Sequence, residues 1–170
     1  SLFIIPGFIA ADKNNITTTL GRGGSDYTAA ILAAAVDASV LEIWTDVSGM
    51  MTADPRLVNN IKHIPQISYQ EAMELSHFGA KVIYPPTIQP VMKKGMPVWI
   101  KNTFAPEEMG TVIKNEATST GTRIQGISSM NTIVLLSLEG SGMVGIPGFS
   151  KRLFEALANA SINVILITQG

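Results

Sequence analysis

A glycine-rich loop between regular segments constrains the fold of this chain most strongly. Residues 16–20 form a short β-branched run, residues 21–26 (GRGGSD) are the loop, and residues 27–38 are rich in alanine and apolar on nearly every side. Residues 40–45 then predict a strand that ends before Asp46. This order is typical of an α/β sheet with helical crossovers: a strand, a glycine loop, a helix that is buried all round, and a second strand.

Other elements of residues 1–113 follow from hydrophobic patterns and from the positions of proline and glycine. The sequence Ser68-Tyr69-Gln70-Glu71 predicts a capping box, in which serine and glutamate side chains bind each other's backbone N–H groups, at the start of a helix that runs to about His77. The remaining expectations are a buried strand over residues 2–10 interrupted by Pro6-Gly7, irregular chain over 47–65, a short helix over 87–94 and a strand over 97–102.

The composition changes after residue 113. Residues 114–126 are polar and rich in threonine, which predicts an interdomain linker. A strand over 132–138, an amphipathic helix over 149–160 and a strand over 162–168 would form one βαβ unit, which is half of a ferredoxin-like module.

Composition excludes several classes of function. With 170 residues, 46% of them hydrophobic, the chain can bury a core without a disulfide or metal, and it contains no cysteine for either. A formal charge of −1 does not favour nucleic acid as a partner. No apolar run approaches the length of a membrane span and no signal peptide opens the chain, so a cytoplasmic location is expected. Strand-like apolar runs at both ends suggest a segment of a longer polypeptide.

The glycine loop could bind a small zwitterion. Its backbone N–H groups converge at a helix N-terminus, which favours an anion. Arg22 offers a planar fork to a carboxylate, and Asp26 suits an ammonium group, so together they suit an amino acid. The loop is neither a P-loop nor a full dinucleotide fingerprint, and the same spacing also fits a tight turn with a capping acid.

A second group of residues could bind a phosphorylated ligand. Asp46 follows a strand, where ligands of open α/β sheets bind, and a carboxylate there can hold Mg²⁺ through water. Arg56 can pair with phosphate, and Lys81 is a point charge of the kind that binds transferring phosphates. The alternatives are an ordinary strand-end turn with a surface Asp-Pro-Arg, and a solvated lysine. His63 and His77 lack a nearby set of metal ligands.

Four strings, in this order along the chain, resemble the aspartokinase family. They are residues 19–27 (TLGRGGSDY), 43–47 (IWTDV), 52–56 (TADPR) and 78–82 (FGAKV). Residues 68–76, 100–103 and 165–169 are similar to the bifunctional aspartokinase–homoserine dehydrogenases. The resemblance implies that residues 1–113 are the C-terminal, nucleotide-binding half of an amino-acid-kinase fold (class α/β), residues 114–126 a linker, and residues 127–170 a truncated ACT regulatory domain.

The resemblance also implies roles for individual residues. By the family motif, L-aspartate contacts Arg22, Gly23, Gly24, Ser25 and Asp26, and the nucleotide contacts Thr45, Asp46, Met51, Arg56, Lys81 and Val82. Lys81 would bind the phosphates, Asp26 would organise catalytic lysines, and Met51 stands where the family commonly has a tyrosine near adenine, so a weaker adenine contact is expected. Ile167 and Gln169 match positions that bind threonine in the bifunctional members.

The implied reaction is transfer of the ATP γ-phosphoryl group, with Mg²⁺, to the β-carboxylate of L-aspartate, the first step toward lysine, threonine, methionine and isoleucine. The family's Lys-Phe-Gly-Gly motif, from the N-terminal kinase half, is absent, so we expect no meaningful turnover from this chain alone. No NADP site is expected either, and the whole protein is expected to be a homo-oligomer. The alternatives are an ACT fragment that senses threonine, and a phosphotransferase of the same fold that acts on another small acid.

Overall fold

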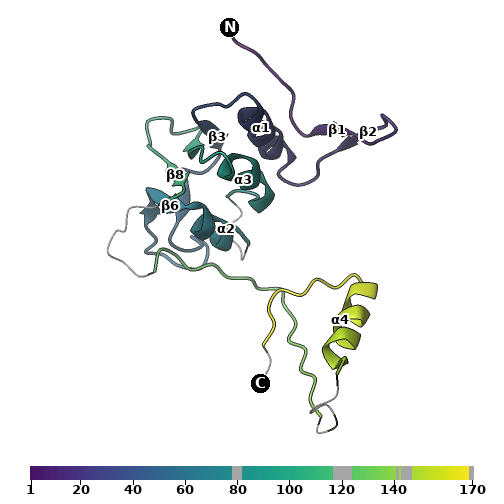
Figure 1. Cartoon of the computed structure of the whole chain (residues 1–170). Helices are drawn as coiled ribbons and strands as arrows, with labels where there is room; N and C mark the ends of the chain where they lie inside the picture. The colour runs from purple at the N-terminus through teal and green to yellow at the C-terminus, as the bar shows by residue number, and fades with distance from the viewer. Residues whose placement is uncertain (78–81, 117–123, 141, 143–146, 169–170) are drawn as a thin grey trace. The chain divides into compact units, whose positions relative to one another are not determined.

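The structure is a computed structural model that describes all residues except 78–81, 117–123, 141, 143–146 and 169–170. The chain forms two units, Ser1–Asn131 and Thr132–Gly170. In the first unit, helices lie against a mixed sheet (Figure 1). None of the helices in the described part of the chain is long and apolar enough to cross a membrane.

The central sheet of the first unit has four strands in the order β3-β7-β8-β6. β3 pairs parallel with β7, β7 antiparallel with β8, and β8 parallel with β6. Their bounds are β3 Leu41–Thr45, β6 Gln66–Ser68, β7 Val98–Asn102 and β8 Thr111–Lys114. Alternate residues point to one buried face, as a period of two requires, and the core residues on it are Leu41, Ile43, Ile67, Val98, Ile100 and Ile113.

Three helices accompany this sheet: α1 Gly24–Ala35, α2 Tyr69–His77 and α3 Pro85–Met92. α1 packs against α3 and β3, and α2 packs against α3 and β6. The expectation that the alanine-rich helix is buried all round is wrong. Ala30 and Ala33 are buried, but Ile31 is 42% exposed, because the packing covers only one side of α1.

The capping box at residues 68–71 is confirmed. The Ser68 hydroxyl donates to Glu71 Oε2 (2.6 Å), which also accepts the backbone N–H of Ser68 (3.0 Å). The backbone N–H of Glu71 in turn donates to Ser68 Oγ (3.2 Å). These bonds satisfy N–H groups at the start of α2 that have no partner within the helix.

Two small antiparallel ladders complete the first unit. β1 Ile9–Ala11 pairs with β2 Thr17–Thr19, and β4 Met50–Met51 pairs with β5 His63–Ile64. The buried strand expected over residues 2–10 is therefore wrong for most of its length: residues 2–5 are exposed and form no strand, because no neighbouring strand in the described part of the chain pairs with them. The segment expected to be irregular contains the β4–β5 ladder.

In the second unit, the predicted helix is present and the predicted strands are not. α4 spans Phe149–Asn159, with Lys151, Arg152 and Glu155 exposed and Leu153, Phe154 and Leu157 half-buried. Residues 132–138 and 162–168 form no strand. The prediction of a βαβ unit is therefore wrong, and only its helix is present. In a ferredoxin-like split βαβ the two strands are not neighbours, and the described residues of this unit supply no strand between them.

Candidate functional site

The glycine loop ends where α1 begins. Gly21 and Gly23 adopt left-handed φ angles of 74° and 73°, and the backbone N–H of Gly24 donates to Gly21 O (3.0 Å). The N–H of Tyr27 donates to Gly23 O (3.0 Å), which starts the helix. Left-handed φ angles are the reason for glycine here, because a β-carbon strains that conformation.

The polar side chains of this loop differ in exposure. Arg22 and Ser25 are exposed, whereas Asp26, in the first turn of α1, is half-buried. Burial raises the pKa of the Asp26 carboxyl because it removes water from the charged form. No lysine or arginine pairs with Asp26 among the residues that the structure describes. An ammonium group of a ligand would compensate this charge.

Tyr84 connects the glycine loop to the segment after residue 81. A β-carbon on Gly23 would lie 2.4 Å from Tyr84 Cβ, so the tyrosine packs directly on the glycine. Val82, two residues earlier, is partly buried against the core. The structure thus brings Gly23, a predicted aspartate-binding residue, next to a tyrosine two positions after Val82, which is predicted to contact the nucleotide. Sequence reasoning missed Tyr84, because no local pattern signals a contact 61 positions away.

The second group of predicted residues begins at the end of β3. The Thr45 hydroxyl donates to Asp46 Oδ1 (3.1 Å), and Thr45 O accepts the N–H of Thr103 (2.8 Å). Asp46 itself is exposed. A carboxylate at this strand end retains one oxygen for a cation or a ligand, as Mg²⁺ sites built on substrate phosphates require.

Arg56 is engaged by its neighbour. Its Nη2 lies 2.7 Å from Asp54 Oδ2 and its Nε 3.0 Å from Asp54 Oδ1, a bidentate pair that lowers the pKa of Asp54 to about 2. The Arg56 side chain is 80% exposed, so the pair contributes little stability. A phosphate would have to share or replace Asp54 as the partner of this guanidinium.

The remaining predicted site residues differ in burial, and two of them are not described by the structure. Met51 is partly buried in β4, opposite His63 in β5. Ile167 is exposed, while Lys81 and Gln169 lie outside the described residues. No hydrogen bond or ion pair in the described part of the chain joins residues 22–26 to residues 45–56. Nor do the described residues include a cluster of three or more histidines and carboxylates that could hold a metal by itself.

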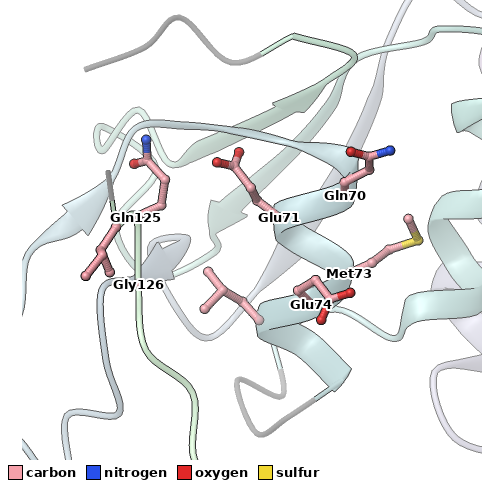
Figure 2. A pocket seen from close by; sticks show the side chains of 8 residues that line it. Gln70, Glu71, Met73, Glu74, Gln125 and Gly126 are labelled. Carbon is pink, nitrogen blue, oxygen red and sulfur yellow. The ribbon is translucent and has the colours of Figure 1, made fainter. Parts of the chain in front are cut away.

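Two pockets lie away from most of these residues. One of about 620 Å³ lies between α2 and residues 124–126, and Figure 2 shows Glu71 and Gln125 on its two sides. It contains no predicted site residue. Another, of about 480 Å³, is lined by Ser48, His63 and Trp99, among others, and adjoins the loop after Asp46. Neither was foreseen, because their walls come from segments distant in sequence.

Family comparisons agree with the two-part organisation. Residues 1–102 match the amino acid kinase family, and residues 136–170 match an ACT domain. The bifunctional aspartokinase/homoserine dehydrogenase of Haemophilus influenzae is 46% identical over 98% of this chain, and the lysine-sensitive aspartokinase 3 of Escherichia coli is 42% identical over 98%. The chain spans only 20% and 37% of those two proteins.

Solved structures give the same result. Aspartokinase III of Escherichia coli, in complex with aspartate and ADP, superposes with a TM-score of 0.76 at 38% identity over 96% of this chain and 36% of that one. Aspartate kinase of Clostridium acetobutylicum superposes with a TM-score of 0.78 at 36% identity, over 97% of this chain and 38% of that one. The predicted resemblance to aspartokinases is therefore confirmed.

Proposed function

Because this chain belongs to the amino acid kinase family, we propose that it is the nucleotide-binding region of an aspartate kinase, with part of the aspartate site. The whole protein would transfer the γ-phosphoryl group of ATP to the β-carboxylate of L-aspartate. The observation that carries this proposal is the glycine loop, which presents exposed Arg22 and half-buried Asp26 at the start of α1. A relative of similar fold is known in complex with aspartate and ADP.

The chemistry of the loop fits an amino acid. The Arg22 guanidinium would bind the α-carboxylate, and Asp26 would face the α-ammonium or the lysines that act on the phosphate. The substrate's own β-carboxylate is the nucleophile, so no activated side chain is required. Phosphoryl transfer needs positioning and cations on the phosphate oxygens rather than covalent catalysis.

The nucleotide would lie against residues 45–56 and 81–82. Asp46 and Thr45 lie at the end of β3, where one carboxylate oxygen is free of the Thr45 bond and can hold Mg²⁺. Bound Mg²⁺ would neutralise charge on the β- and γ-phosphates. Arg56, released from Asp54, and Lys81 would supply further positive charge, and Met51 would pack near the base.

The test measures acyl phosphate, trapped as hydroxamate, for the whole protein and for this chain alone. We expect aspartate-dependent product from the whole protein and none from the chain. In the whole protein, Arg22→Ala should raise the KM for aspartate by about 10-fold or more and leave the KM for ATP near wild type, because loss of a charged hydrogen bond weakens only one ligand. A preference for another acid would assign a different phosphotransferase, and turnover by the isolated chain would contradict its proposed incompleteness.

A second role concerns residues 136–170, which match an ACT domain. We propose that this segment contributes to an amino-acid effector site through Ile167 and Gln169, with threonine as the first candidate. Aspartokinase III of Escherichia coli has also been solved with lysine and aspartate, so lysine is the comparison ligand. Calorimetric titration of the whole protein and of its Gln169→Ala variant tests the contact. Unchanged threonine affinity in the variant would remove Gln169 from the site.

A further inference from the structure

We propose that Thr111, at the start of β8, is a positioning residue for the nucleotide: its hydroxyl holds β4, the strand that carries Met51, in place. This inference rests on the proposed nucleotide-binding function. Thr111 lies 29 positions after Val82, the last residue that is expected to contact the nucleotide, and it belongs to no motif that predicts a site. Its role follows from the bonds that one buried hydroxyl makes.

Thr111 is fully buried, and its hydroxyl joins three segments. Oγ1 donates to the backbone oxygen of Ile64 in β5 (2.6 Å) and accepts the backbone N–H of Met50 in β4 (2.8 Å). His63 Nε2 lies 3.2 Å from the same oxygen. Because a hydroxyl has one proton, the bond to Ile64 leaves Oγ1 as an acceptor toward both Met50 and His63. The hydroxyl therefore ties β4 to β5 as well as to β8.

The backbone around this hydroxyl is built for close approach. A β-carbon on Gly49 would lie 2.3 Å from Thr111 Oγ1, and Gly49 has a φ of 118°. Gly110, immediately before Thr111, has a φ of 73°, and a β-carbon there would lie 2.0 Å from Ile100 O. Only glycine fits at both places. The loop before β4 and the start of β8 therefore lie in close contact next to the hydrogen bond between Met50 N–H and the Thr111 hydroxyl.

A second side chain holds the other part of the same loop. Asn102, the last residue of β7, donates through Nδ2 to Ser48 Oγ (2.9 Å). The loop from Asp46 to Met51 is thus held by the end of β7 and the start of β8, and neither Asn102 nor Thr111 is among the residues predicted to touch nucleotide. Loss of either bond should weaken nucleotide binding through the loop and spare the aspartate site.

The experiment compares Thr111→Val with Thr111→Ser in the whole protein. Valine preserves shape and removes the hydroxyl, whereas serine retains it. We expect Thr111→Val to raise the KM for ATP, and the Kd of Mg²⁺–ADP by calorimetry, about 3- to 10-fold, with the KM for aspartate unchanged, because each net hydrogen bond contributes modestly. Thr111→Ser should restore both values to near wild type. Ser48→Ala, a milder change in the same loop, should raise the same two values in the same direction.

Thr87→Val is the matched control. Thr87 is also fully buried, but its hydroxyl has no hydrogen-bond partner among the described residues, so this variant should leave both nucleotide values unchanged. The proposal is overturned if Thr111→Val lowers only the melting temperature, or if it weakens aspartate and nucleotide equally. A whole protein that binds Mg²⁺–ADP but does not phosphorylate aspartate would refute the proposed function alone, because the calorimetric comparison would still test Thr111.

Discussion

Single residues of the glycine loop combine conformational and steric constraints. Gly21 and Gly23 have almost the same left-handed φ, yet a β-carbon would meet nothing within 4 Å at Gly21 and the Tyr84 side chain at Gly23. Asp26, in the first turn of α1, carries the cost of partial burial without a cationic partner among the described residues. The partial burial of this carboxyl is unfavourable for folding alone and is understandable in a loop that binds a ligand.

The two glycines form a matched pair for mutation. Gly21→Ala should cost about 1–2 kcal/mol, which is the penalty for a side chain in the left-handed region. Gly23→Ala should cost clearly more, because Tyr84 must also move. Thermal unfolding of both variants measures the difference. Equal losses of stability would show that Tyr84 yields without cost, and would remove the steric argument for Gly23.

Asp26 provides a prediction about pH. Its pKa is raised in the folded state by burial, so the unfolded chain loses this proton at a lower pH than the folded chain. Below the pKa of the unfolded chain, Asp26 is protonated in both states and its contribution to stability is fully present. As pH rises through the pKa of the folded state, the buried carboxyl becomes charged and that contribution is lost. Asp26→Asn has no such loss, so its melting temperature relative to wild type should increase as pH rises from about 4, the ordinary pKa of an aspartate, through the raised pKa of the folded state.

At the scale of elements, short-range signals at helix ends are reliable here. The serine and glutamate of the capping box make reciprocal bonds. The helix expected over residues 87–94 is present as α3 but begins two residues earlier, at Pro85, because proline needs no N–H partner in the first turn. The strands behave differently. β6 and β8 are short, and they pair with each other although Gln66 and its partner Val112 are 46 positions apart.

Removal of the cap tests its contribution to α2. Ser68→Ala should destabilise the first unit by about 1 kcal/mol, the usual cost of losing an N-terminal cap. For a chain of this size that corresponds to a drop of about 2–4 °C in melting temperature. Ser39→Ala, at an exposed position before β3, should leave the melting temperature unchanged. A double-mutant cycle with Glu71→Ala should show that the two losses are not additive, and additive losses would argue against a reciprocal box.

At the scale of the whole molecule, the two units differ in how completely their elements are buried. The first unit has a continuous core of seventeen buried apolar residues in its described part. In the second unit, α4 contains no buried residue, and the described residues on either side of it form no strand. An isolated helix of this length is marginal in water.

This difference predicts unequal protection of backbone amides. In hydrogen exchange of the 170-residue chain, β7 and β3 should exchange slowly, near the rate of global unfolding, while α4 should exchange orders of magnitude faster. Peptide-level mass spectrometry can measure both regions in one experiment. Protection of α4 comparable to that of β7 would show that the segments around it pair in solution, and would restore the βαβ unit expected from the sequence.

The amino-acid sequence was sufficient for features that depend on near neighbours. Glycine at left-handed positions, the capping box, α1, α2 and α4 follow from contacts within a few residues, because backbone conformation and helix hydrogen bonds are local. The family motifs also predict Arg22, Asp26 and Asp46 as site residues. These residue types can be recognised in a sequence because binding a carboxylate requires a cation such as arginine, and binding an ammonium group or Mg²⁺ requires a carboxylate.

Only the tertiary structure decided which distant segments meet. Thr111 bonds Met50 across 61 positions, Tyr84 packs on Gly23, and the irregular segment before β6 contains the β4–β5 ladder. The strands expected in the second unit failed for the same reason that these contacts could not be foreseen. A strand exists only with a partner, and partners are chosen by packing across the fold rather than by the sequence of the segment itself.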